Sequence, residues 1–303
     1  MRGIILAGGS GTRLRPLTSV HSKQLLPVYD KPMVYYPLAV LMQSGVREIL
    51  IISTPAHLEI YRELLGDGHK LGISLEYAVQ DEPKGLAQAL IIGQEFIGDE
   101  QVCLVLGDNI FYGHRLPDML REEAFRLDGC TLFGYPVGDP ERYGVAEMDE
   151  DGNIVSLEEK PLHPKSNLAV TGLYMYDNEA VRRAIALEPS ARGELEITDL
   201  NRTFVDEGRA RLVNLGRGSA WFDTGTHDSL LEAATFVQIL EKRQGIRISC
   251  LEEVAYRMGY IDHEQLALIG KELSGSSSYG QYVIDLARQE AAEPLSLTPR
   301  AAA

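Results

Sequence analysis

The sequence of 303 residues is poor in cysteine and has no long apolar run. Its three cysteines, Cys103, Cys130 and Cys250, are far apart and form no CxxC pair, so neither a disulfide framework nor a zinc site is predicted. No apolar run approaches the roughly 20 residues that cross a bilayer, and the opening apolar run is too short for a signal peptide. We therefore expect a cytoplasmic protein with no membrane partner.

Positive charge is also in deficit. The chain has 29 Lys and Arg against 44 Asp and Glu, which gives a formal net charge of −15. Such a charge repels nucleic acids and anionic membrane surfaces, so neither is expected as a partner. An anionic substrate must then be met by particular cations, which gives weight to any Lys or Arg beside a glycine-rich loop.

In the first half of the chain, short apolar runs alternate with helical patterns. Continuous apolar strands separated by helices are typical of a parallel sheet covered on both faces, and ligands bind beyond the carboxyl ends of such strands. The predicted strands are 3–7, 48–52, 75–79 and 102–106, and the predicted helices are 31–44, 56–65 and 86–96.

After residue 129 the strand-like runs follow one another closely, which predicts a mixed, β-rich part continuous with the first half. These runs are 131–137, 144–148, 154–157 and 170–176. The chain is mostly helical from residue 226 onward. We predict a core over 1–226, a helical C-terminal region over 227–291 packed on it, and a flexible tail over 292–303.

The strongest chemical signal is the loop Gly8-Gly9-Ser10-Gly11-Thr12-Arg13, which follows the first strand directly. Glycines let backbone N–H groups approach phosphate oxygens, and an arginine adds positive charge. A tight turn is the plainer interpretation. A dinucleotide fingerprint is disfavoured because its last glycine position holds Leu14, and because no acid follows the second strand. We predict a cradle for a triphosphate.

Several charged residues near this loop are candidates for the same site. Lys23 is predicted to be a second phosphate contact, although a lone lysine is usually a solvated surface group. Asp108 follows the strand 102–106 and Asp223 follows a second apolar run. Either could simply cap the next segment, but two such acids beside a phosphate loop predict a Mg²⁺ site.

Two further segments carry weaker signals. Glu159 and Lys160 end a predicted strand, where neighbouring side chains point to opposite faces, so only one of the two is expected to face the pocket. An ordinary charged edge strand or turn is the alternative interpretation of this pair. Gln80 lies in a polar loop that opens a helix and could contact the edge of a base, or be an ordinary loop residue.

Taken together, these segments closely resemble the glucose-1-phosphate thymidylyltransferase family of sugar nucleotidyltransferases. The resemblance covers residues 1–290, and the run Ser22-Lys23-Gln24-Leu25-Leu26-Pro27 is the most specific part, because the uridylyl branch usually has another sequence there. It continues through 85–89, 106–113, 158–161, 170–174 and 220–227. Leu168 departs from the family pattern, since an aromatic residue is common there, and this affects the expected shape of the sugar pocket.

The resemblance implies a Rossmann-like, mixed but mostly parallel sheet flanked by helices, and the transfer of a thymidylyl group from dTTP to glucose 1-phosphate with Mg²⁺. It implies catalytic roles for Arg13, Lys23 and Lys160, and metal ligation by Asp108 and Asp223. The implied nucleotide contacts are Leu6, Gly8, Gly9, Ser10, Gly11, Thr12, Arg13, Gln24, Gln80, Pro83, Gly85 and Asp108. The implied sugar-phosphate contacts are Leu106, Asn109, Gly144, Glu159, Lys160, Val170, Tyr174 and Trp221.

The resemblance also implies a homotetramer, a place in deoxysugar biosynthesis such as that of rhamnose, and an allosteric feedback site for a dTDP-sugar. Arg217, Glu253 and Arg257 are the candidates for that site, and surface ion pairs are the plainer interpretation of them. Two other functions stay open: transfer of a uridylyl or other nucleotidyl group, and a non-catalytic sugar-nucleotide sensor with the same fold.

Overall fold

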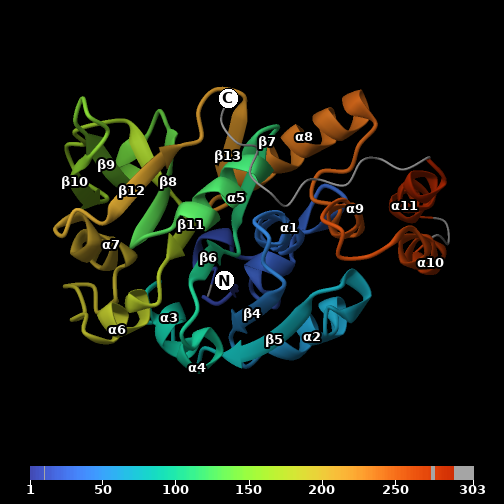
Figure 1. Ribbon diagram of the computed structural model, residues 1–303, viewed down its shortest axis with the longest axis horizontal. Helices are drawn as coiled ribbons and strands as arrows, with labels where there is room; N and C mark the ends of the chain where they lie inside the picture. Colours follow the sequence, from blue (N-terminus) through green and yellow to red (C-terminus); the bar gives the residue numbers. More distant parts are fainter. Residues whose placement is uncertain (10, 274–276, 290–303) are drawn as a thin grey trace.

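The structure is a computed structural model that describes residues 1–9, 11–273 and 277–289 (Figure 1). At its centre, β1 (Arg2–Leu6) lies between β4 (Glu48–Ser53) and β6 (Val102–Leu106), and β5 (Ser74–Val79) extends the sheet beyond β4. All of these neighbours are parallel. The predicted parallel sheet is therefore confirmed, and its carboxyl ends meet at one edge.

The sheet becomes mixed at β11 (Leu168–Tyr176). This strand runs antiparallel to β6, to β8 (Cys130–Pro136) and to β9 (Gly144–Met148). Beyond them lie β10 (Ile154–Glu159), antiparallel to β9, and β12 (Ala210–Asn214), parallel to β8. One continuous sheet of nine strands thus joins the parallel half to the β-rich half, as the sequence predicted.

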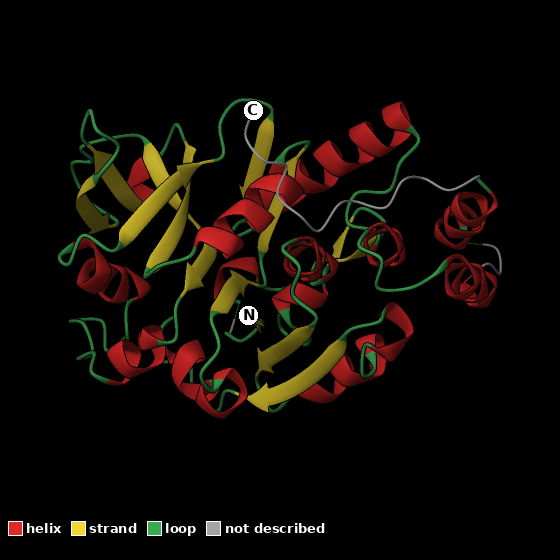
Figure 2. Ribbon diagram, viewed as in Figure 1, coloured by secondary structure: helices red, strands yellow, loops and turns green. Residues whose placement is uncertain are grey.

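Helices cover both faces of the sheet (Figure 2). Alternate strand residues serve two separate cores: Ile5 and Val105 face one, and Ile4 and Leu104 face the other. Each fully buried aliphatic side chain contributes about 1.5–3 kcal/mol by leaving water. The first core also includes residues of α1 (Tyr35–Gln43), α5 (Leu116–Arg126) and α9 (Leu251–Arg257). The second includes residues of α3 (Gln88–Ile92), α4 (Gln94–Ile97), α6 (Glu179–Ile185) and α7 (Ile197–Val205).

Two predicted helices differ from the structure. The helix predicted over 31–44 begins only at Tyr35, because β3 (Lys31–Pro32) pairs with β2 (Pro27–Val28) in a small hairpin. The helix predicted over 86–96 is divided between α3 and α4 at Gly93. A Cβ at that glycine would lie 2.8 Å from Ile4 Cδ1, so glycine lets this segment approach β1 without displacing that side chain.

A separate two-stranded ladder, which the sequence did not predict, stands at the carboxyl edge of the main sheet. It pairs β7 (Asn109–Gly113) with β13 (Ser219–Asp223) in antiparallel register, so that Asp223 lies opposite Asn109. Because β7 follows β6 after a short turn, the ladder brings the end of β13 beside Asp108.

The chain after β13 is helical. It forms α8 (His227–Gln244), α9, α10 (His263–Leu273) and α11 (Ser278–Arg288), drawn in orange to red in Figure 1. A reciprocal capping box between Thr226 and Ser229 starts α8. Within the residues described, no helix is both long and apolar enough to cross a membrane. The predicted boundaries of the core and the helical region stay predictions, and the predicted tail over 292–303 lies outside the described residues.

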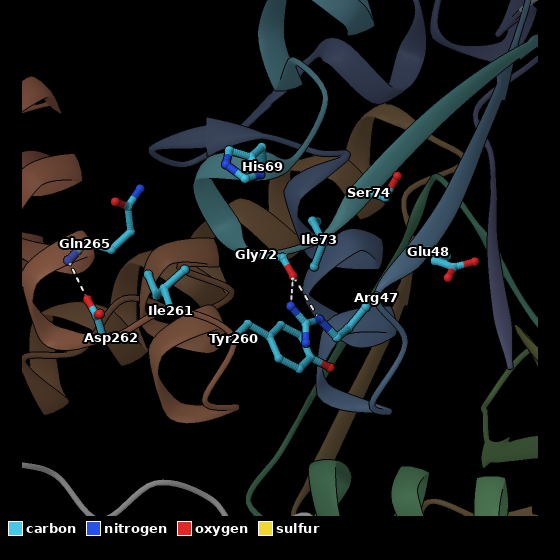
Figure 3. A pocket seen from close by; sticks show the side chains of 10 residues that line it. All are labelled: Arg47, Glu48, His69, Gly72, Ile73, Ser74, Tyr260, Ile261, Asp262 and Gln265. Atoms are coloured by element: carbon cyan, nitrogen blue, oxygen red, sulfur yellow. Dashed lines mark hydrogen bonds between the residues drawn. The ribbon is translucent and has the colours of Figure 1, made fainter.

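The region around α10 contacts the core through Tyr260, beside a groove of about 680 Å³ (Figure 3). Arg47 stacks on the Tyr260 ring and donates two hydrogen bonds to Gly72 O, at 2.9 and 2.6 Å. A Cβ at Gly72 would lie 2.3 Å from Tyr260 O, so this contact also requires glycine. The groove therefore lies where the α10 region packs against the core. Its arginine, Arg47, is already hydrogen-bonded to Gly72 O.

Candidate active site

The glycine-rich loop leaves β1 at the carboxyl edge of the sheet. Gly9 and Gly11 have φ values of 101° and 54°, which favour glycine. The Thr18 hydroxyl donates to Gly11 O at 2.7 Å and closes the loop. Arg13, in the short turn that follows, is exposed, and its Nη1 lies 3.4 Å from the position that a Cβ on Gly225 would take. Ser10 lies outside the described residues.

The two predicted metal ligands converge on the same edge. Asp108 follows β6 and Asp223 ends β13, and the β7–β13 ladder joins them. Thr224 strengthens this joint, because its hydroxyl donates to Asp108 O at 2.8 Å and its N–H does so at 3.2 Å. Lys23, which is buried, donates from Nζ to Asp108 Oδ2 at 2.5 Å. The structure therefore brings Arg13, Lys23 and both acids together at the carboxyl edge of the sheet, where ligands of such sheets bind, and this place is called the cleft from here on.

The two carboxylates differ in their electrostatic surroundings. Burial opposes ionisation of Asp108, but the Lys23 ammonium and the hydrogen bonds from Lys23 and Asn109 hold its pKa below the usual value. Burial and the charge of Asp108 raise the pKa of Asp223, although Lys23, Arg13 and Arg142 partly offset this. Burial and the mutual repulsion of the two carboxylates thus oppose ionisation of Asp223, and a further cation bound beside it would favour its ionised form.

This donor set suits Mg²⁺, which binds one or two carboxylates and completes its shell with phosphate oxygens and water. Among the described residues, no group of three or more His, Cys, Asp or Glu side chains could hold a metal ion. A metal that depends only on protein ligands therefore has no site in that part of the chain, whereas one shared with a triphosphate fits the two acids.

On the other side of β6, three predicted sugar contacts form one row across neighbouring strands. Gly144 pairs with Glu159 on β10 and with Val170 on β11. A Cβ at Gly144 would lie 3.4 Å from both Glu159 Oε2 and the Thr198 hydroxyl. The absence of a side chain at this position keeps the Glu159 carboxylate accessible from the cleft. That carboxylate accepts a hydrogen bond from Thr198 Oγ1 at 2.6 Å.

Two cations flank Glu159. Lys160 has a φ of 44°, which turns the chain out of the strand, and its Nζ lies 3.5 Å from Glu159 Oε1. Arg192 comes from the loop before α7, and its Nη2 lies 3.6 Å from the same oxygen. Arg192 is also hydrogen-bonded to both carboxylate oxygens of Glu196, at 2.9 and 2.8 Å, so Lys160 is the cation with more freedom to meet a second phosphate.

Asn109 and Trp221 form the floor between the two halves of the cleft. Trp221 Nε1 donates to Asn109 Oδ1 at 2.6 Å, while Asn109 Nδ2 donates to Asp108 Oδ1 at 2.9 Å. The Trp221 ring packs edge-on against Tyr143, with ring centroids 5.1 Å apart. Tyr174 is buried beneath this region, and Leu106 is half-buried at the end of β6.

The predicted base contacts are not in one place: Gln24 packs against Gly107, just after β6, whereas Gln80 directly follows β5. Gln24 is buried and accepts a hydrogen bond from the Ser22 hydroxyl at 2.8 Å, and Gln80 is buried against Gly8. Pro83 is exposed. Gly85 has a φ of 104° and is needed for a second reason: a Cβ there would lie 2.3 Å from a backbone oxygen, that of Leu195.

The predicted regulatory residues lie away from this cleft. Arg217 is exposed in the turn between β12 and β13, beside a hollow of about 580 Å³. Glu253 and Arg257 form an ion pair on α9 at 2.6 Å, and the Tyr282 hydroxyl donates to Glu253 at 2.5 Å. Within the described part of the chain, no recorded contact joins Arg217 to this pair, so their assignment to one site stays a prediction.

Sequence reasoning missed Arg142, Tyr143, Arg192, Thr198 and Thr224. Tyr143 directly precedes Gly144, and Thr224 directly follows Asp223, so adjacency to a predicted residue could have identified both. Arg192 and Thr198 reach Glu159 from more than 30 residues along the chain, a proximity that only the fold reveals.

Known proteins share the family and the fold of this chain. A family model described as nucleotidyl transferase matches residues 2–239. Glucose-1-phosphate thymidylyltransferase from Xanthomonas campestris pv. campestris is 57% identical over 290 residues, which is 96% of this chain and 98% of that protein.

Solved structures share the fold. A Bacillus anthracis protein assigned as a glucose-1-phosphate thymidylyltransferase and crystallised with sucrose has a TM-score of 0.73 and 42% identity, covering 78% of this chain and 94% of that one. A UDP-glucose pyrophosphorylase in complex with UDP-glucose has a TM-score of 0.67 and 26% identity, covering 80% and 99%.

Proposed function

The chain belongs to the nucleotidyl transferase family, in the branch of the glucose-1-phosphate thymidylyltransferases, and we propose that its cleft joins dTTP to glucose 1-phosphate with Mg²⁺ held by Asp108 and Asp223. The enzyme transfers the thymidylyl group to the sugar phosphate and releases dTDP-glucose and pyrophosphate. The observation that carries the site assignment is the convergence of Asp108, Asp223, Lys23 and Arg13 at one edge of the sheet.

The triphosphate lies, in this proposal, along the loop from Gly8 to Arg13. Backbone N–H groups of the glycines contact its oxygens, and Arg13 and Lys23 supply positive charge. When bound, Mg²⁺ supplies further neutralisation of the phosphate charge. Lys23 already sits at hydrogen-bond distance from Asp108, so its ammonium is held where negative charge accumulates as pyrophosphate leaves.

Glucose 1-phosphate enters from the side of β9 and β10. Lys160 and Arg192 draw in its phosphate, and the Glu159 carboxylate, oriented by Thr198, accepts hydrogen bonds from sugar hydroxyls. The sugar phosphate is already an anionic nucleophile, so no general base is required. Its oxygen attacks the α-phosphorus in line with the departing pyrophosphate, and catalysis is mostly positioning and charge neutralisation.

The test is a pyrophosphate-release assay in which dTTP, UTP, CTP and ATP are compared side by side with glucose 1-phosphate. We expect release with dTTP only when Mg²⁺ is present and none after EDTA treatment. Faster turnover with UTP than with dTTP would instead favour the uridylyl alternative. Tight binding of dTDP-glucose without any turnover would favour the sensor.

We further propose, from the family resemblance, a homotetramer with a feedback site for a dTDP-sugar near Arg217 or near the Glu253–Arg257 pair. Inhibition of pyrophosphate release by a dTDP-sugar, lost in Arg217→Ala and Arg257→Ala, would support this feedback site. The cytoplasmic location and a place in deoxysugar biosynthesis such as that of rhamnose stay predictions.

A further inference from the structure

The side chain of Gln80 is a buried amide in the wall of the cleft. Gln80 directly follows β5, and only 3% of its surface is exposed. Its backbone N–H donates to Ser53 O at 2.8 Å, which ties it to the end of β4. In the sheet order, β6 lies on one side of β1, and β4 and β5 lie on the other. A nucleotide whose phosphates cross the loop after β1, toward Asp108, therefore has the β5 side available for its base.

The orientation of this amide follows from its neighbour, Gln88. The backbone N–H of Lys84 can only donate, and it contacts Gln88 at 2.9 Å, so the atom that it meets must be Gln88 Oε1. The same oxygen lies 2.8 Å from the Gln80 amide, so the atom of Gln80 that faces it must be the donor Nε2. The backbone N–H of Lys84 thus fixes which end of the Gln80 amide faces Gln88: Nε2 faces Gln88, and Oε1 faces away from it.

The other end of the Gln80 amide points to the glycine-rich loop. A Cβ built on Gly8 would lie 2.1 Å from Gln80 Oε1. Among the residues that the structure describes, no donor is recorded for this oxygen. Gln80 Oε1 is also not among the described buried side-chain atoms that lack a partner, so it is open to solvent beside the loop that binds the triphosphate in the proposed function. An acceptor with an open bonding position there can accept a hydrogen bond from the substrate.

We propose that Gln88 is a positioning residue that sets base selectivity by holding the Gln80 oxygen toward the cleft. This inference rests on the proposed function and deepens it. Thymine and uracil carry a hydrogen on N3, which the Gln80 oxygen accepts. Cytosine has a lone pair on N3 and faces the same oxygen with a second acceptor, so it is excluded. If the Gln80 amide turned over, its N–H group would meet the cytosine N3 and the preference would reverse.

The test uses Gln88→Met, which removes the acceptor with little change in volume, and Gln88→Glu, which keeps an acceptor for both Lys84 N–H and Gln80 Nε2. Steady-state kinetics are measured with dTTP, dUTP and dCTP at saturating glucose 1-phosphate and Mg²⁺. In Gln88→Met, we expect the ratio of kcat/KM for dTTP to that for dCTP to fall by about tenfold or more, because the amide populates both orientations.

The internal control is the ratio for dTTP to dUTP. Both bases carry the N3 hydrogen, so this ratio stays within about twofold of the wild type. For dTTP, we expect Gln88→Met to raise KM more than it lowers kcat, since Gln88 lies away from the phosphates. In Gln88→Glu the dTTP to dCTP ratio is retained.

An unchanged dTTP to dCTP ratio in a folded Gln88→Met variant overturns the proposal, and so does an equal loss of that ratio in Gln88→Glu. If Gln88→Met fails to fold, as judged by thermal unfolding, Gln88→Leu takes its place as the variant without an acceptor, and a loss of the dTTP to dCTP ratio in Gln88→Glu still overturns the proposal. Failure of the proposed function is a separate result, because it appears as a wild-type enzyme that releases no pyrophosphate from dTTP.

Discussion

Substitution of Asn109 tests how the cleft is built, because this buried amide serves three partners. Its Oδ1 accepts hydrogen bonds from Gly172 N at 3.0 Å and Trp221 Nε1 at 2.6 Å, and its Nδ2 donates to Asp108 Oδ1 at 2.9 Å. In Asn109→Leu both buried donors lose their acceptor, at about 1–3 kcal/mol each. We therefore expect the free energy of unfolding to fall by about 2–6 kcal/mol, a large part of the roughly 5–15 kcal/mol typical of a domain.

Asn109→Asp is the matched control. It keeps an acceptor oxygen for Gly172 and Trp221, so the fold loses less stability. It removes the donor to Asp108 and places a second carboxylate beside it. A lost hydrogen bond to a charged group is worth about 1.5–3 kcal/mol, so we expect turnover to fall by about tenfold or more.

Trp221 is the single tryptophan of the chain and lies in this network, so its fluorescence reports directly on urea unfolding. Unfolding is measured with EDTA present, and activity is measured by pyrophosphate release. A leucine variant within about 0.5 kcal/mol of the wild type, a size usual for surface substitutions, would refute the role assigned to this amide.

Four further predictions concern the same cleft. Asp108→Asn and Asp223→Asn should each lower kcat by about 100-fold or more while folding is retained, since each removes charge from the metal site; wild-type rates in both would contradict the assignment. Because the pKa of Asp223 is raised, the folded protein binds more protons than the unfolded chain at pH values between the ordinary and the raised pKa. The free energy of unfolding of the metal-free protein therefore falls as pH rises through that window. Urea titrations should show this fall in the wild type and not in Asp223→Asn. Thr198→Val should raise KM for glucose 1-phosphate by about 10- to 100-fold with little change in KM for dTTP, since the hydroxyl orients Glu159; equal changes in both constants would count against it. Gly85→Ala should lower the melting temperature, because its Cβ would lie 2.3 Å from a backbone oxygen at a φ of 104°, and a melting temperature equal to that of the wild type would refute that reason.

The parallel half of the sheet could be predicted because its strands are continuous apolar runs with helices between them. The run 102–106 coincides with β6, and the run 3–7 differs from β1 by one residue at each end. The pairing of β7 with β13 could not be predicted, because it joins segments more than 100 residues apart. The hairpin before α1 was missed because its two-residue strands carry no periodic pattern.

Some residues of the candidate site could likewise be proposed from the sequence, and others could not. Asp108 could be proposed from the sequence because it follows a parallel strand, and the carboxyl edge of a parallel sheet is where ligands bind. Glu159 ends an antiparallel strand, so this rule does not apply to it and its signal is weaker. The partners of Glu159 could not be proposed, because Thr198 and Arg192 contact it only through the folding of α7 and its preceding loop against β10. The orientation of Gln80 likewise depends on a hydrogen bond that no sequence pattern specifies.

The most direct measurement is a crystal structure of the protein with dTTP and Mn²⁺, with anomalous scattering used to locate the metal. A single strong anomalous peak within bonding distance of both Asp108 and Asp223, with the triphosphate over the loop from Gly8 to Arg13, is the predicted result. A manganese ion bound elsewhere, or a triphosphate outside that loop, would contradict the account.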